Sequence, residues 1–83
     1  MSDVHVFGAD WCEDTQHTLE HLSALGVHFD YTDVERDPSA KEFVKQHNDG
    51  KQKTPTVDVK GTVLSVPADE DLDMVLRQKE LLA

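Results

Sequence analysis

The fold is decided by the stretch GADWCEDT, residues 8–15, which contains the only cysteine of the chain, Cys12. The run before it, VHVFG (4–8), is β-branched and aromatic, which is typical of a short buried strand. After it, from about residue 13 to residue 25, apolar or small residues recur every three or four positions, as on one face of a helix: Thr15, Leu19, Leu22 and Leu25. We therefore expect Cys12 where a strand ends and a helix begins. Asp10 and Glu13 have the spacing of a capping box for that helix.

The rest of the chain continues the alternation of strands and helices. Residues 28–34 follow a two-residue period typical of a strand, and Asp37-Pro38 opens a second helix that ends at Asn48. Two short strands joined by the turn Lys60-Gly61 predict a hairpin, and three acids at 69–71 begin a last helix. The order βαβαββα predicts an α/β fold, a small mixed sheet flanked by helices. Its first two strands should be parallel and its hairpin antiparallel.

Length, composition and charge narrow the function. The chain has 83 residues, 17 of them acidic and 8 of them Lys or Arg, so its net charge is −9 with His neutral. Such a charge repels phosphate backbones and anionic lipids, so we expect no nucleic-acid or membrane partner, whereas a basic protein partner would be favoured. We find neither an export signal nor an apolar run of about 20 residues, the length of a membrane span. We expect a cytoplasmic monomer with a single domain over residues 1–83.

A lone cysteine excludes an internal disulfide and any zinc site built from several thiolates. At the start of a helix, unpaired N–H groups and the helix dipole stabilise the reactive thiolate. Asp10, Glu13 and Asp14 oppose ionisation, so we expect a modest net lowering of the thiol pKa. Thr15 lies close enough on the helix to donate its hydroxyl to the sulfur. The alternative is an inert buried cysteine, with Glu13 and Asp14 serving only the helix dipole.

Two other features carry weaker signals. Thr54-Pro55-Thr56 precedes the third predicted strand, an unremarkable position for proline when taken alone. His17 and His21 are four residues apart and could face one ion, but no third ligand stands at a recognisable spacing. We therefore interpret them as part of a polar helix face and expect no metal site.

Taken together, these motifs resemble the glutaredoxin branch of the thioredoxin superfamily, and most closely the short bacterial glutaredoxin-like proteins that include mycoredoxins. The resemblance rests on Trp-Cys-x-x-Thr after the first strand, on Thr-Pro-Thr-Val before the third, and on the βαβαββα order. It implies a thioredoxin-like fold and a thiol–disulfide oxidoreductase in cell redox homeostasis. The substrates would be mixed disulfides between a protein or small molecule and a low-molecular-weight thiol. That thiol, glutathione or an equivalent, would be the co-substrate, with no bound cofactor.

The resemblance also implies roles for individual residues. Cys12 would be the attacking thiolate and Thr15 its hydrogen-bond partner. Trp11 would form a wall of the groove, and Thr54 with a cis Pro55 would align the substrate backbone. Lys53 would be a partner for a substrate carboxylate.

Three departures from the family pattern set limits on this hypothesis. Thr15 occupies the position of a resolving cysteine, so only a monothiol route remains. Ala9 and Asp10 stand where glutathione-binding members carry a Lys or Arg, and residues 65–68 replace a Gly-Gly pair. The alternative is a catalytically weak thioredoxin-fold module that binds a protein partner. A reductase of oxyanions such as arsenate would need an arginine cluster, and the chain has only Arg36 and Arg77.

Overall fold

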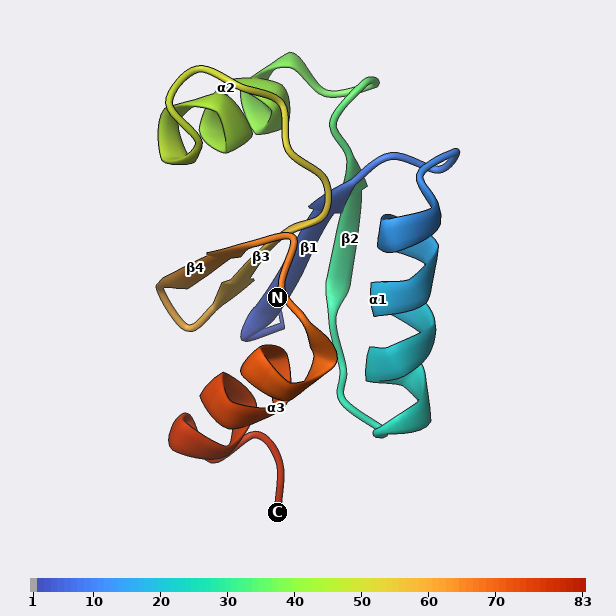
Figure 1. Ribbon diagram of the computed structural model, residues 1–83, viewed down its shortest axis with the longest axis vertical. Helices are drawn as coiled ribbons and strands as arrows, with labels where there is room; N and C mark the ends of the chain where they lie inside the picture. Colours follow the sequence, from blue (N-terminus) through green and yellow to red (C-terminus); the bar gives the residue numbers. More distant parts are fainter. Residues whose placement is uncertain (1) are drawn as a thin grey trace.

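The computed structural model describes residues 2–83 and contains a four-stranded sheet and three helices (Figure 1). The elements follow the predicted order βαβαββα. Their bounds are β1 Val4–Gly8, α1 Glu13–Ala24, β2 Asp30–Asp33, α2 Pro38–His47, β3 Thr56–Val59, β4 Thr62–Ser65 and α3 Asp69–Gln78. The predicted α/β fold is confirmed.

The sheet has the strand order β2-β1-β3-β4 and is mixed. β1 pairs in parallel with β2, as expected for strands joined by a helix, and antiparallel with β3. β3 and β4 form the predicted hairpin, in which Lys60 and Gly61 both have positive φ and Val59 pairs with Thr62. β2 is shorter than predicted because β1 offers it only four partners, from His5 to Gly8.

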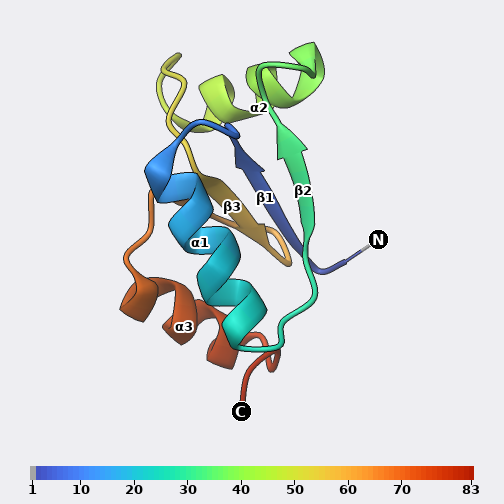
Figure 2. The ribbon, with the colours of Figure 1, turned by 90° about the vertical axis from the view of Figure 1, so that its right-hand side faces the viewer.

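The alternation of side chains along β1 creates two apolar layers. Val4 and Val6 face α1 and α3, where they pack with Leu22, Leu72 and other buried residues. The opposite face of β1 turns Phe7 towards α2, against a smaller cluster of Val34, Ala40, Val44 and Phe43. α1 and α3 therefore cover one face of the sheet and α2 the other (Figure 2). At the carboxyl end of β1 the chain turns into α1.

Candidate functional site

Cys12 is the N-cap residue of α1, directly after the turn that leaves β1. Its backbone N–H donates to the carbonyl of Ala9 at 3.0 Å, and its own carbonyl accepts from the N–H of Gln16 at 3.0 Å. The predicted capping box is wrong, because the N-cap position falls on Cys12, two residues after Asp10, and the Asp10 carboxylate is bound by Tyr31. With no side-chain cap at this end of α1, the first turn presents its free N–H groups to the cysteine.

The loop before β3 brings a second segment to the sulfur. The hydroxyl of Thr54 donates to Cys12 Sγ at 3.4 Å, and Sγ lies 3.7 Å from the Thr54 carbonyl oxygen. The Thr54-Pro55 peptide bond is cis, as the family resemblance implies, and Pro55 is fully buried. Two segments 42 residues apart in the sequence therefore meet at one thiol.

The surroundings of Cys12 favour its thiolate. Partial burial acts to raise the pKa of the thiol. The hydroxyls of Thr54 and Thr15 and the backbone N–H groups of Thr15 and Asp14 act to lower it. The lowering effects prevail, so the pKa of Cys12 lies below its ordinary value. The expected direction of the shift is confirmed, and hydroxyl donors supply a large part of it.

The Thr15 hydroxyl, which helps to lower the pKa of Cys12, also binds the backbone at the end of β1. The residue is fully buried, and its hydroxyl oxygen also accepts the N–H of Ala9 at 3.3 Å. Gly8 makes room for it, because a Cβ atom at Gly8 would lie 2.4 Å from Cγ2 of Thr15 and 2.6 Å from its Oγ1. The small residue at the end of β1 is therefore a requirement for the hydroxyl beside Cys12.

The expected role of Asp10 needs correction, because its carboxylate is held away from the helix terminus. Tyr31 donates its hydroxyl to Asp10 Oδ1 at 2.7 Å, and Arg36 lies 3.7 Å from Asp10 Oδ2. Burial and the Asp10 carboxylate raise the pKa of Tyr31 far above its ordinary value, so its hydroxyl stays protonated and donating. Partial burial of the sulfur, not Asp10, is the leading effect that opposes ionisation of Cys12.

Trp11 and Val66 are exposed apolar side chains close to these segments. Trp11 is 71% exposed and donates its indole N–H to the carboxylate of Glu35. Val66 is 43% exposed, and its N–H donates to the carbonyl of Pro55 at 2.8 Å. Lys53 is exposed in the loop before Pro55. Of the predicted site residues, the structure brings together Cys12, Thr15, Thr54 and Pro55. The side chains of Trp11 and Lys53 are exposed to solvent.

Tyr31, Arg36 and Glu35 are site residues that the sequence did not reveal. Each contacts Asp10 or Trp11, in the turn before Cys12. The three residues lie in β2 or in the turn after it, more than twenty positions away in the chain. No local spacing links them to Cys12. The parallel pairing of β1 with β2, which puts the ends of both strands at one edge, was the only available signal.

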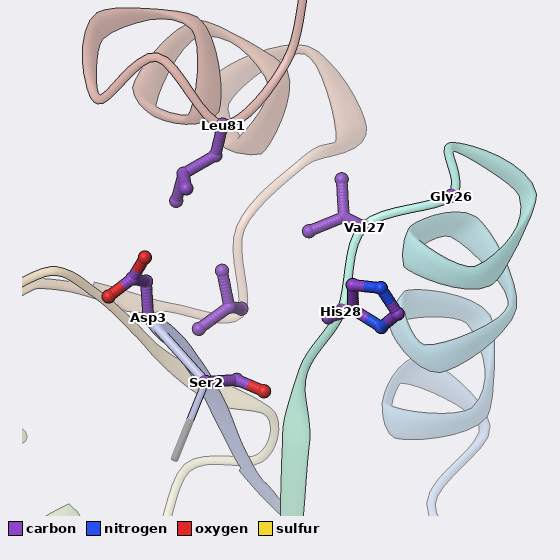
Figure 3. A pocket seen from close by; sticks show the side chains of 7 residues that line it. Ser2, Asp3, Gly26, Val27, His28 and Leu81 are labelled. Atoms are coloured by element: carbon purple, nitrogen blue, oxygen red, sulfur yellow. The ribbon is translucent and has the colours of Figure 1, made fainter.

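A pocket of about 430 Å³ lies at the opposite end of the sheet, where β1 begins (Figure 3). Leu81 and Val27 line one side of it, and Ser2 and Asp3 line the other. None of the predicted site residues lines this pocket. Over residues 2–83, no three His, Cys, Asp or Glu side chains are grouped so as to hold a metal ion. In the same range, no helix is both long and apolar enough to span a membrane.

A βαβαββα fold with a thiol at the start of α1, facing a cis-proline, defines a thioredoxin-like redox protein. Residues 4–64 match the family model of glutaredoxin. The chain belongs to the glutaredoxin family. It is 40% identical over 57 residues to mycoredoxin 1 of Corynebacterium glutamicum, a match that covers 69% of this chain and 70% of that protein.

Solved structures share this fold. A mutant of the thioredoxin-like protein BC3987 superposes with a TM-score of 0.82 at 26% identity, covering 93% of this chain and 97% of the other. A glutaredoxin from Archaeoglobus fulgidus superposes with a TM-score of 0.76 at 22% identity, covering 93% and 88%. The second likeness concerns the fold alone.

Proposed function

We propose that this protein reduces mixed disulfides between a protein or small molecule and a low-molecular-weight thiol, by a monothiol route through Cys12. The observation that carries the proposal is the position of the Cys12 sulfur. It stands at the N-terminus of α1, 3.4 Å from the hydroxyl of Thr54, with a lowered thiol pKa. Membership of the glutaredoxin family supports the same chemistry.

The reaction has two exchange steps. In the first, the Cys12 thiolate attacks the sulfur of the small thiol within the mixed disulfide. A bond from Cys12 to the small thiol forms, the substrate disulfide breaks, and the substrate leaves as a thiolate that takes up a proton. In the second, another molecule of the small thiol attacks that sulfur as its thiolate. The bond between Cys12 and the first small thiol breaks, the two small thiols leave as a symmetrical disulfide, and Cys12 is released as its thiolate. Overall, the mixed disulfide and one free molecule of the small thiol give the reduced substrate and the symmetrical disulfide of the small thiol, and Cys12 is unchanged.

The residues around Cys12 have distinct roles in this proposal. Thr15 and Thr54 stabilise the thiolate as attacking and as leaving group. The backbone of Thr54, held beside the sulfur ahead of Pro55, pairs with an extended substrate. Trp11 forms a wall of the groove, and Lys53 attracts a substrate carboxylate from the loop.

We infer that the small thiol carries less negative charge than glutathione. Glu13, Asp14 and Glu35 are exposed acids in the segments that surround Cys12 and Trp11. The net charge of −9 adds to their repulsion of an anionic tripeptide. A glutathione mixed disulfide should therefore react more slowly than one of an uncharged thiol such as 2-mercaptoethanol. Added salt should narrow the difference.

The test uses a protein whose cysteine carries 2-mercaptoethanol as a mixed disulfide. The rate of its reduction is measured with the wild type and with the Cys12→Ser variant. We expect the wild type to accelerate release of the small thiol and to carry it as an adduct on Cys12, visible by mass spectrometry. The Cys12→Ser variant should show neither. Equal rates for the wild type and the variant would overturn the proposal.

The second candidate function is a module that binds a partner without catalysis. The exposed Trp11 and Val66 favour it, since both are apolar surfaces available to a partner. The net charge of −9 favours a basic partner. Under this alternative, affinity for the partner should survive Cys12→Ser and fall with Trp11→Ala. Under the exchange reaction, capture of the partner requires the cysteine.

A further inference from the structure

The helices α1 and α3 are joined by a cluster of two histidines and two aspartates. His17 Nε2 lies 2.9 Å from Asp69 Oδ2, and His21 Nε2 lies 2.7 Å from Asp73 Oδ1. Asp69 also reaches the other nitrogen of His21, with Nδ1 at 3.7 Å. The two rings are parallel, with centroids 6.4 Å apart. Both pairs join residues 52 positions apart in the chain.

An ionised carboxylate only accepts hydrogen bonds, so the Nε2 atoms of His17 and His21, which are hydrogen-bonded to Asp69 and Asp73, must each carry a hydrogen. A neutral ring supplies one such donor. His21 also lies near a second carboxylate, but its Nδ1 is 3.7 Å from Asp69, which is too far for a hydrogen bond. Protonation also converts each neutral contact into a charge-assisted hydrogen bond, which is the stronger kind. The contact between His17 and Asp69 therefore favours the protonated form of His17.

The other charged groups near the cluster act in the same direction. Glu20 and Asp14 on α1 add their negative charge around His17, alongside Asp69 on α3. The hydrogen bond and the charge of Asp69 are the main reasons why the pKa of His17 is raised above 6.5. His21 is the more enclosed ring, with its side chain 18% exposed between Asp69 and Asp73. The parallel ring of His21, with its centroid 6.4 Å from that of His17, could also become positively charged and would then repel a protonated His17.

We propose that His17, His21, Asp69 and Asp73 form a proton-dependent clamp that fastens α3 to α1. Since the folded protein holds its proton on His17 more tightly than the unfolded chain does, the clamp contributes fully below about pH 6.5. Its contribution declines as the pH rises through the raised pKa. The apolar contacts of Leu72 and Leu76 with Leu22 remain at all pH values and keep α3 in place. The clamp is independent of the disulfide chemistry proposed above, so either inference can fail without the other.

Thermal unfolding at several pH values tests the clamp, comparing the wild type with the double variant His17→Gln/His21→Gln. The span from about pH 5.5 to about pH 9 brackets the ordinary pKa of histidine. We expect the double variant to lose the most melting temperature at the acidic end and progressively less towards the basic end. His28→Gln is the matched control, because His28 is exposed in the loop before β2, and it should show no such trend. A loss that is equal at every pH, or that grows with pH, would overturn the proposal.

Asp69→Asn gives a second measurement that does not require the double variant to fold. In an NMR titration of the histidine ring protons, this substitution should move the pKa of His17 down towards 6.5. An unchanged titration of His17 would contradict the clamp as directly as the unfolding result.

Discussion

At the scale of single residues, Thr15 connects the backbone to the chemistry. Its one hydroxyl accepts the N–H of Ala9 and donates towards Cys12, so the end of β1 and the reactive sulfur share a group. The sequence predicted the second contact from helical spacing but not the first. The full burial of Thr15 depends on how closely α1 approaches β1, and no local pattern reports that distance.

Gly8→Ala tests this close approach. The new methyl group would overlap Thr15, so we expect a loss of about 1–3 kcal/mol in the free energy of unfolding, measured with denaturant. The displaced hydroxyl should also leave the thiol with a higher pKa. Adding Thr15→Ser, which removes Cγ2 and keeps the hydroxyl, should restore part of the stability. An unchanged free energy of unfolding in Gly8→Ala would show that the approach is looser than described.

Thr54→Val tests the second hydroxyl. Because this substitution keeps the side-chain shape and removes the donor at 3.4 Å, the pKa of Cys12 should rise. The ultraviolet absorbance of the thiolate, followed against pH, measures the change. Thr62→Val, in the distant hairpin, is the control and should leave the titration unaltered. If the two variants titrate alike, Thr54 has no part in stabilising the thiolate.

At the scale of elements, the helix ends separate what sequence could predict from what it could not. Asp37 was predicted to cap α2, and its carboxylate does accept the N–H groups of Ser39 at 3.0 Å and Ala40 at 3.2 Å. Asp10 had equally good spacing before α1 but is bound by Tyr31 from β2. A local cap could be predicted when nothing distant competed for the carboxylate. Where a neighbouring strand did compete, spacing alone was misleading.

Substitution of Asp37 should destabilise the N-terminal turn of α2. We expect Asp37→Ala to lower the melting temperature at neutral pH, whereas Asp37→Asn, which keeps a capping oxygen, should stay close to the wild type. These hydrogen bonds lower the pKa of Asp37 below 3.8. The wild type should therefore have its full excess of stability over Asp37→Ala above pH 3.8, and this excess should disappear as the pH falls through the lowered pKa of Asp37. An Asp37→Ala variant as stable as Asp37→Asn at neutral pH would rule out the cap.

At the scale of the whole molecule, polar side chains form contacts between elements, and these contacts could not be predicted from the sequence. The order of elements, the hairpin and the pairing of β1 with β2 could all be predicted, because they follow from hydrophobic period and turn residues. Asn48 could be predicted only as a helix end. It is 7% exposed and links α2 to both strands of the hairpin, donating to Thr56 Oγ1 at 3.3 Å and accepting from Ser65. His17 and His21 were likewise interpreted only as part of a polar helix face, and Asp69 only as an acid at the start of the last helix.

Asn48→Ala should therefore cost more than its place at a helix end suggests. Removal of the amide takes its donor away from the Val44 carbonyl and from the buried Thr56 hydroxyl, which keeps only its bond to the Lys53 carbonyl. We expect a loss of about 1–3 kcal/mol in the free energy of unfolding. Gln46→Ala, an exposed position in α2, is the control and should change it by less than about 0.5 kcal/mol. Equal effects of the two substitutions would remove Asn48 from the framework of the fold.

The central claim is that Cys12 is a nucleophilic thiolate, and its rate of alkylation by iodoacetamide as a function of pH tests this most directly. Cys12 is the only cysteine, so the reaction reports one sulfur and requires no knowledge of the natural substrate. We predict a midpoint below about 8.5, the pKa of a free cysteine thiol. A midpoint at or above that value, or negligible reaction at every pH, would contradict the account and favour the binding module.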